Sequence, residues 1–126
     1  MSRNVVMAPG AATAGPYSHA VWSGDLLYLS GQTPVNPATR QLVEGDIGVQ
    51  VAQCFANLFA VLREAGLTPQ HVTKVNVFLT DINDFAAMND VYRTQFEAPF
   101  PARTTIGVAA LPLGARVEIE MIARRS

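Results

Sequence analysis

Apolar residues recur at three- and four-residue spacing in two stretches of the chain, the pattern of a helix with one buried face. The first stretch opens at Asp46, a residue type that caps helix starts, and stops at Gly66, with Pro69 shortly after. The second follows the polar run 81–84 and stops before Pro99. The apolar positions are Ile47, Val51, Cys54, Phe55, Leu58, Phe59 and Leu62 in the first predicted helix, and Phe85, Met88, Tyr92 and Phe96 in the second.

Runs rich in β-branched and apolar residues, separated by turn residues, predict six strands. Ser23-Gly24-Asp25 joins the second strand to the third in a hairpin, and Gly31 ends the third strand. Residues 32–44 contain two prolines and are predicted to form a loop. The six strands are expected over Val5–Met7, His19–Trp22, Leu26–Ser30, Val72–Thr80, Thr104–Val108 and Val117–Ala123.

The resulting order, β-β-β-α-β-α-β-β, predicts a single α+β domain over residues 1–126. Its mixed sheet carries both helices on one face. Because several strands are apolar at most positions, both faces of the sheet require burial. We therefore expect the helix-free face to pack against other copies of the chain in a closed homo-oligomer.

Composition and charge narrow the classes of function. The 126 residues are 49% hydrophobic and carry a net charge of −1, with Lys74 as the one lysine. Nucleic-acid and anionic-membrane binding need clustered Lys and Arg, so neither is expected. No apolar run approaches the roughly 18 residues of a membrane span, and no secretory leader is expected.

The single cysteine and the two histidines carry little chemistry of their own. Cys54 is the one cysteine, so an internal disulfide framework is excluded, and a reducing, cytoplasmic location is expected. Its position on the apolar helix face predicts a small core residue rather than a nucleophile. His19 and His71 lie far apart without ligand spacing, so no metal site is expected.

Arg103 is the most informative residue because it lies in the stretch Phe100–Val108, which otherwise has the apolar pattern of a strand. A guanidinium group matches a carboxylate through two parallel hydrogen bonds, which Lys cannot reproduce. Glu118 and Glu120 stand on the next predicted strand, and side chains two residues apart share a face. An Arg and a Glu on two neighbouring strands could bind a small carboxylate and hold a water molecule beside it. A structural ion pair on a solvated sheet face is the alternative.

Several motifs in register resemble the reactive-intermediate (enamine/imine) deaminase family, Rid, also called YjgF/YER057c/UK114. The resemblance spans essentially the whole chain, including the lengths between motifs. The motifs are Gly15-Pro16-Tyr17-Ser18, Leu29-Ser30-Gly31-Gln32-Thr33-Pro34, Asn83-Asp84-Phe85 with Met88-Asn89-Asp90-Val91-Tyr92, Phe100-Pro101-Ala102-Arg103 with Leu111-Pro112, and Glu118-Ile119-Glu120.

The resemblance implies a chorismate-mutase-like α+β fold and a homotrimer with three clefts between subunits. It implies hydrolysis of 2-imino acids, formed from enamines such as 2-aminoacrylate or 2-aminocrotonate, to 2-keto acids and ammonia. No metal or organic cofactor is implied. Small 2-imino and 2-keto acids would be the partners.

Site residues are carried over position by position from the resemblance. Arg103 matches the arginine that binds the substrate carboxylate, and Glu118 matches the acid that positions the attacking water. The cleft-lining positions correspond to Tyr17, Ser30, Gly31 and Asn89. Thr105 stands where many members have Cys, which removes thiol chemistry and changes the polarity of the pocket.

Simpler roles stay open for three of these residues. Tyr17 could pack over a turn, Ser30 could cap backbone groups, and Asn89 could be solvated. Gly31 is expected to permit a close approach of backbone to ligand.

Three other functions compete with this reading. The chain could deaminate a larger enamine, such as 2-aminomuconate. It could also be a non-catalytic trimer that binds keto or amino acids as a regulator. RNA cleavage finds little support in an acidic chain without a basic stripe.

Overall fold

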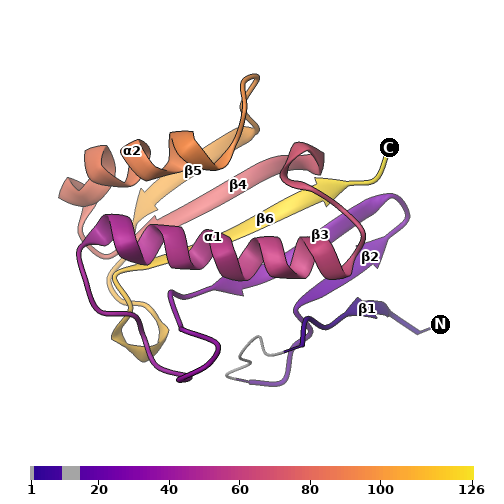
Figure 1. Ribbon diagram of the computed structural model, residues 1–126, viewed down its shortest axis with the longest axis horizontal. Helices are drawn as coiled ribbons and strands as arrows, with labels where there is room; N and C mark the ends of the chain where they lie inside the picture. Colours follow the sequence, from indigo (N-terminus) through magenta and orange to yellow (C-terminus); the bar gives the residue numbers. More distant parts are fainter. Residues whose placement is uncertain (1, 10–14) are drawn as a thin grey trace.

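Two helices lie on one face of a six-stranded sheet in the computed structural model, which describes residues 2–9 and 15–126 (Figure 1). Met1 and residues 10–14, part of the predicted domain, lie outside the described residues. The strands are β1 (Asn4–Val6), β2 (Ala20–Ser23), β3 (Leu26–Gln32), β4 (Val72–Leu79), β5 (Ala102–Gly107) and β6 (Val117–Arg124). The helices are α1 (Ile47–Glu64) and α2 (Phe85–Gln95), accompanied by the short 3₁₀ turns η1 (Pro69–His71), η2 (Ile82–Asp84) and η3 (Pro112–Gly114).

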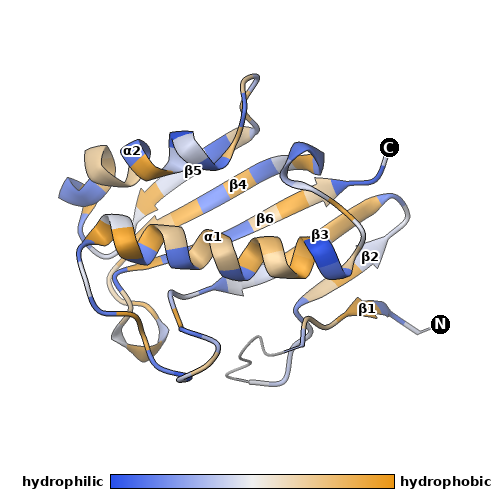
Figure 2. Ribbon diagram, in the orientation of Figure 1, coloured by the Kyte–Doolittle hydropathy of each residue, from blue (hydrophilic) through white to orange (hydrophobic). Residues whose placement is uncertain are grey.

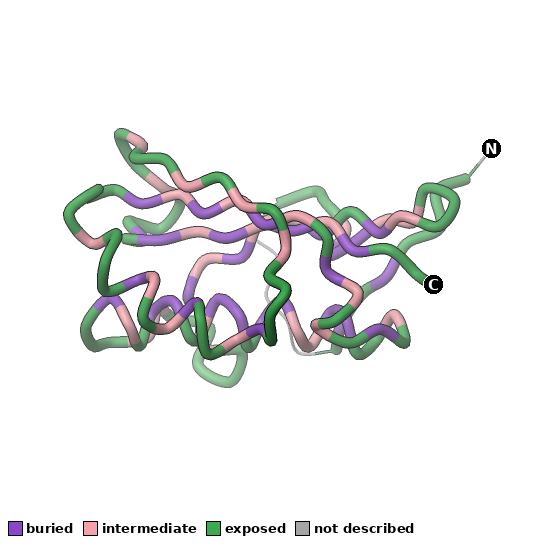
Figure 3. The backbone as a smooth tube through the Cα atoms, turned by 90° about the horizontal axis from the view of Figure 1, so that it is seen from above, coloured by how far each residue is buried: buried purple, intermediate pink, exposed green. Residues whose placement is uncertain are grey.

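The sheet has the strand order β1-β2-β3-β6-β4-β5. β4 and β5 run parallel, and every other neighbouring pair is antiparallel. The mixed sheet and the placement of both helices on one side confirm the predicted α+β class (Figure 3). α2 supplies the crossover that a parallel β4–β5 pair requires.

The core lies between the sheet and the helices. Along β6, Val117, Ile119, Met121 and Ala123 are buried, while the residues between them face the other side of the sheet. Orange apolar positions are interspersed with blue polar ones along β4 and β6 (Figure 2). Phe55 of α1 packs edge-on against Tyr92 and Phe96, with ring centroids 5.6 Å apart in both pairs. The predicted apolar faces therefore meet as expected.

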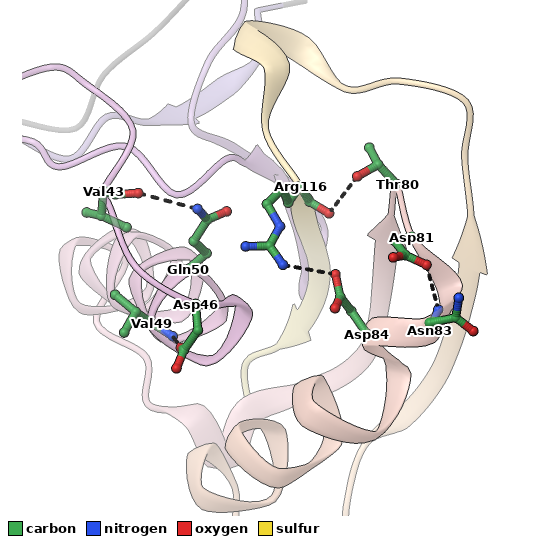
Figure 4. A network of polar contacts seen from close by, with 9 residues as sticks. All are labelled: Val43, Asp46, Val49, Gln50, Thr80, Asp81, Asn83, Asp84 and Arg116. Atoms are coloured by element: carbon green, nitrogen blue, oxygen red, sulfur yellow. Dashed lines mark hydrogen bonds and ion pairs between the residues drawn. The ribbon is translucent and has the colours of Figure 1, made fainter.

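Capping and ion pairing fix the ends of the helices near the start of β6 (Figure 4). Asp46 caps α1 by accepting a hydrogen bond from the Val49 N–H at 3.0 Å. Arg116, just before β6, pairs with Asp84 at the start of α2 at 3.3 Å. The Arg116 carbonyl accepts the Thr80 N–H at 3.1 Å. These contacts hold the start of β6 against the start of α2.

Most strand boundaries differ from the sequence prediction by one or two residues; β5, for example, spans Ala102–Gly107 rather than Thr104–Val108. Gly31 does not end the third strand: β3 continues to Gln32, through a register irregularity between Leu29 and Gln32. Such a bulge bends a strand without ending its pairing, and the sequence offers no pairing partner from which to foresee it. The first strand lies one residue earlier than predicted, over Asn4–Val6.

The helix-free face carries an apolar row across its β1–β6 half. Registered neighbours Val5, Val21, Tyr28 and Ile122 form this row, and Lys74 of β4 follows Ile122. Val5 and Tyr28 are 48% and 46% exposed. The described residues contain no helix that combines the length and the hydropathy needed to cross a membrane.

Candidate active site

Glu118 projects from the helix-free face of the sheet with its carboxylate uncommitted. It shares this face with Glu120, as the two-residue spacing predicts. The Glu120 carboxylate accepts a hydrogen bond from Asn76 Nδ2 at 3.0 Å. Glu118 makes no hydrogen bond or ion pair with any residue that the structure describes. Of the two acids, Glu118 is therefore the one with free acceptor sites.

Gly31 makes room for the Glu118 side chain. A Cβ atom at position 31 would clash with Glu118 Oε2 and lie 3.1 Å from Cδ and 3.3 Å from Cγ. The absence of a side chain at position 31 thus allows the close approach of Glu118, and the expected approach of the Gly31 backbone to a ligand stays a prediction. The bulge in β3 brings Gly31 beside Glu118 of β6.

A hollow of about 680 Å³ brings four of the predicted site residues together. Tyr17, Ser30, Gly31 and Glu118 all line it, along with Gln32, Thr33, Val35, Arg40, Pro112, Leu113 and Glu120. The hollow is open, on the face opposite the helices. It is the place where a small polar ligand could meet the Glu118 carboxylate.

Ser30 ties the segment before β2 to β3. Its hydroxyl donates to the Ser18 carbonyl at 2.6 Å, and its N–H donates to the His19 carbonyl at 2.9 Å. The hydroxyl proton is therefore committed to backbone, in line with the capping alternative. The same two bonds hold neighbouring Tyr17 at the edge of the hollow, where it is 42% exposed.

The environment of Glu118 raises the pKa of its carboxyl group. Partial burial is the larger cause, and the nearby negative charge of Glu120 adds to it. Both effects disfavour the ionised form. A carboxylate with a raised pKa is a stronger base, which suits proton abstraction from water.

Two residues around the hollow adopt a left-handed backbone that residues other than glycine seldom populate. Arg40 and Leu113 both have φ of 64°, and they are the positive-φ residues other than glycine within the described ranges. Both line the same hollow. Backbone strain of this kind gathers at functional sites, although it also occurs in ordinary tight turns. Sequence reasoning did not select either residue.

Arg103 points to the other side of the sheet, toward α2. It pairs in register with Val75, a core residue, and its guanidinium lies over the rings of Tyr92 and Phe85. Its Nη1 is 4.0 Å from Met88 Sδ. No carboxylate from the described part of the chain forms an ion pair with it. The guanidinium donors are thus available for an external anion.

Arg103 lines a second hollow, of about 310 Å³. Asn89 and Phe100 are among the residues that line it. The Asn89 Oδ1 and Thr105 Oγ1 atoms are buried and have no hydrogen-bond partner within the described residues. Thr105 is two residues from Arg103 and therefore on the same strand face. Asn89 is therefore half-buried and lines the same hollow as Arg103.

Arg103 and Glu118 are not on neighbouring strands, contrary to the sequence prediction. β4 lies between β5 and β6, because the chain inserts β6 into the middle of the sheet. The two side chains also project from opposite faces, since Arg103 contacts α2 and Glu118 faces away from the helices. Neither a structural ion pair nor a shared substrate site can form between them within one chain.

Other sites in the molecule carry less chemistry. Burial, reinforced by the negative charge of Glu118, raises the pKa of the fully buried Cys54 thiol, so the interpretation of Cys54 as a core residue is confirmed. A hollow of about 760 Å³ between η1 and the 94–101 segment contains Glu97 as its one ionisable side chain and none of the predicted site residues. Across residues 2–9 and 15–126, no three His, Cys, Asp or Glu side chains group as a metal site requires.

Sequence reasoning missed the aromatic surroundings of Arg103. The sequence pattern places Phe85 and Tyr92 on the apolar face of the second helix. Tyr92 is buried as this predicts, whereas Phe85 is 38% exposed. Their seven-residue spacing places both on one helix face. That spacing was visible in the sequence, but the placement of β5 beside this face was not.

Comparisons with known proteins agree with the fold and with the resemblance. The model of the family described as Endoribonuclease L-PSP matches residues 7–125. A 2-iminobutanoate/2-iminopropanoate deaminase from Dermatophagoides farinae is 50% identical over 108 residues, which are 86% of this chain and 84% of that protein.

Two solved structures show the same arrangement of elements. RidA from the Antarctic bacterium Psychrobacter sp. PAMC 21119 superimposes with a TM-score of 0.93 at 42% identity, covering 98% of this chain and 100% of that one. E. coli TdcF with bound serine gives a TM-score of 0.91 at 37% identity, covering 98% and 99%. Since the family model spans nearly the whole chain, and sequence and fold are both shared with these relatives, the chain belongs to the family described as Endoribonuclease L-PSP, the Rid (YjgF/YER057c/UK114) family.

Proposed function

We propose that the protein hydrolyses 2-imino acids to 2-keto acids and ammonia, in clefts formed between copies of the chain. The observation that carries this proposal concerns two charged side chains. Neither the Glu118 carboxylate nor the Arg103 guanidinium forms an ion pair within the described residues, and the two lie on opposite faces of one sheet. The relative from Dermatophagoides farinae is named for this reaction, which supports the assignment.

The substrate carboxylate binds Arg103 through two parallel hydrogen bonds, which fixes the orientation of the C=N group. A water molecule held by Glu118 attacks the imine carbon, and Glu118 accepts a proton from it. Proton return to nitrogen then allows the carbinolamine to lose ammonia as the C=O bond forms. One water is consumed for each keto acid and ammonia released. Positioning supplies much of the acceleration, because an imine is already electrophilic.

The remaining site residues would complete the cleft. Tyr17 is placed to close over the substrate from the rim of the Glu118 hollow. The Asn89 carbonyl oxygen accepts hydrogen bonds and suits the N–H of an imine. Thr105, in place of the family cysteine, adds a hydroxyl beside Arg103 without thiol chemistry. Ser30 and Gly31 would shape the wall on which Glu118 rests.

Assembly is part of the proposal, because one chain cannot present both groups to one substrate. A second copy whose β5 edge meets the Glu118 hollow of the first would bring an Arg103 and a Glu118 together. The apolar row of Val5, Val21, Tyr28 and Ile122 provides a surface for such packing. A closed homotrimer with three equivalent clefts satisfies this requirement for every copy.

The acidic chain fits a small-molecule enzyme of the cytoplasm better than a ribonuclease, despite the family description. Its net charge is −1, and RNA binding depends on clustered cationic side chains. Arg40 is the one cationic side chain among the residues that line the Glu118 hollow.

The test is keto-acid release in a reaction where threonine or serine dehydratase generates the imine. We expect the wild-type protein to accelerate release, and Arg103→Ala to lose roughly a hundredfold or more of kcat/KM, since two charge-assisted hydrogen bonds disappear. Arg103→Lys should also be severely impaired, because a point charge does not reproduce the paired donors.

Arg63→Ala is a matched control, because Arg63 is an exposed arginine in the last turn of α1 and lines none of the three hollows described above. It should retain wild-type rates. Normal turnover by Arg103→Ala would contradict the assignment. Binding of 2-keto acids without turnover would favour the regulatory reading, and turnover limited to bulky substrates would favour a larger enamine.

A further inference from the structure

The guanidinium of Arg103 is held by aromatic rings and a sulfur atom instead of by acids. Its Cζ lies 4.6 Å from the ring centroid of Tyr92 and 5.5 Å from that of Phe85. Both distances are within the range of a cation–π interaction. Met88 Sδ, 4.0 Å from Nη1, completes the contacts. All three partners come from one face of α2.

The acidic residues within α2 and directly before it form ion pairs with arginines other than Arg103. Asp84 pairs with Arg116 at 3.3 Å, and Asp90 pairs with Arg93 at 3.7 Å. An acid within reach of Arg103 would compete with any external carboxylate for its donors. The arrangement instead holds the cation against π faces, which attract its charge without accepting its in-plane N–H groups.

We propose that Phe85 and Tyr92 form an aromatic seat that positions Arg103, so that its guanidinium is presented to the substrate carboxylate already oriented. This inference rests on the proposed function of Arg103. The two rings contact the guanidinium of Arg103 and act through it, so they are positioning residues. Pre-orientation lowers the ordering cost of binding, because a long arginine side chain otherwise loses much rotamer freedom.

The two rings have different surroundings, which makes one of them a clean target for mutation. Tyr92 is 5% exposed and belongs to the core cluster of Phe55 and Phe96. Phe85 is 38% exposed in the first turn of α2. Replacing Phe85 by Leu keeps an apolar, helix-compatible side chain and leaves the core intact. The interaction of the ring with Arg103 is lost.

The test compares Phe85→Leu with Phe85→Tyr, which retains the ring. We expect Phe85→Leu to raise the KM for the imine and the Kd for 2-oxobutanoate, a stable carboxylate probe, about two- to fivefold, the range of an exposed cation–π contact. The turnover number kcat and the melting temperature should stay near wild-type values. Phe85→Tyr should retain the wild-type KM and Kd, because the ring is kept.

A spectroscopic measurement examines the seat without any ligand. Ring currents from the two aromatic faces should shift the Nε–Hε NMR signal of Arg103 upfield of the other arginines. Phe85→Leu should move this signal back toward the others, and Phe85→Tyr should not. The spectrum of Arg103→Lys should lack this signal, which assigns the signal to Arg103.

The outcomes separate this inference from the proposed function. Unchanged KM, Kd and NMR shift in Phe85→Leu would overturn the seat, whether or not the wild type hydrolyses imines. Equal losses in Phe85→Leu and Phe85→Tyr would also overturn it, because the ring would then not be the relevant feature. Failure of the wild type to accelerate imine hydrolysis would count against the proposed function alone.

Discussion

At the scale of single residues, the site depends on which polar groups have partners and which do not. Glu120 is bound by Asn76, so Glu118 is left as the free acid of the pair. The Ser30 hydroxyl is committed to backbone, and Arg103 rests on aromatic rings. Residue type alone could not distinguish Glu118 from Glu120, since both point the same way from β6. Their neighbours in the folded chain make the difference.

The charge of Glu120 should tune the pH dependence of catalysis. Glu120 helps to raise the pKa of Glu118, after the larger effect of burial. Glu120→Gln removes that charge while keeping an oxygen that can accept from Asn76, so the pKa of Glu118 should fall. Because the carboxylate is the active form, activity is lost as pH drops through this pKa. The acid limb of kcat/KM should therefore move to lower pH in Glu120→Gln.

The measurement is the pH dependence of kcat/KM in the assay in which a dehydratase generates the imine. Glu97→Gln is the matched control, because Glu97 lines the separate hollow near η1 and should leave the profile unchanged. An acid limb that stays in place, or moves to higher pH, in Glu120→Gln would refute Glu118 as the titrating base.

At the scale of elements, the pairing of β3 with β6 builds the Glu118 hollow. The irregularity between Leu29 and Gln32 sets Gly31 against Glu118. The parallel crossover through α2 places Arg103 under that helix. The ion pair between Arg116 and Asp84 holds these two parts of the chain together (Figure 4).

A methyl group at position 31 should displace the Glu118 carboxylate. In Gly31→Ala the new Cβ would overlap Glu118 Oε2, so the flexible acid should rotate away while the backbone keeps its course. We expect kcat to fall about 10- to 100-fold, part of the contribution of a positioned general base. KM should change little, because Arg103 still binds the carboxylate.

Gly107→Ala serves as the control in the kinetic assay. Its Cβ would lie 3.6 Å from Ile82 Cβ, an ordinary van der Waals contact, in a strand of the same sheet. Wild-type kcat in Gly31→Ala would show that the position of Glu118 is unimportant for turnover.

At the scale of the whole molecule, the sheet leaves one face without helices. Arg103 and Glu118, the two groups proposed for catalysis, lie on opposite faces of this sheet, so they would share one site only if copies of the chain assemble. The apolar row on the free face, beside the polar Glu118 hollow, gives that face both a packing surface and a cleft. Activity and assembly should therefore be lost together.

A charge on the apolar row should separate the copies. Tyr28→Glu places a carboxylate at a 46% exposed position of the helix-free face, where the isolated chain tolerates it and a packed interface does not. We expect single chains in analytical ultracentrifugation, with circular dichroism unchanged, and near-complete loss of imine hydrolysis.

Val49→Glu is the matched control, because Val49 is 47% exposed near the start of α1, where an acid is favourable. It should remain assembled and active. A fully active monomeric Tyr28→Glu variant would contradict a site shared between copies.

The sequence by itself determined the class of fold, the two helices, the strand positions to within a residue or two and the family. Local periodicity and turn residues specify these features, because they depend on neighbours along the chain. Through the resemblance it also predicted Arg103, Glu118 and the cleft-lining residues as the site, and this assignment stays a prediction.

Only the tertiary structure decided how those residues relate in space. The strand order places β4 between Arg103 and Glu118, and the register sends their side chains to opposite faces. It also decided that Gly31 accommodates Glu118 and that Phe85 and Tyr92 support Arg103. These are contacts between residues distant in the chain, and strand order and register arise from the packing of the whole sheet rather than from any local pattern.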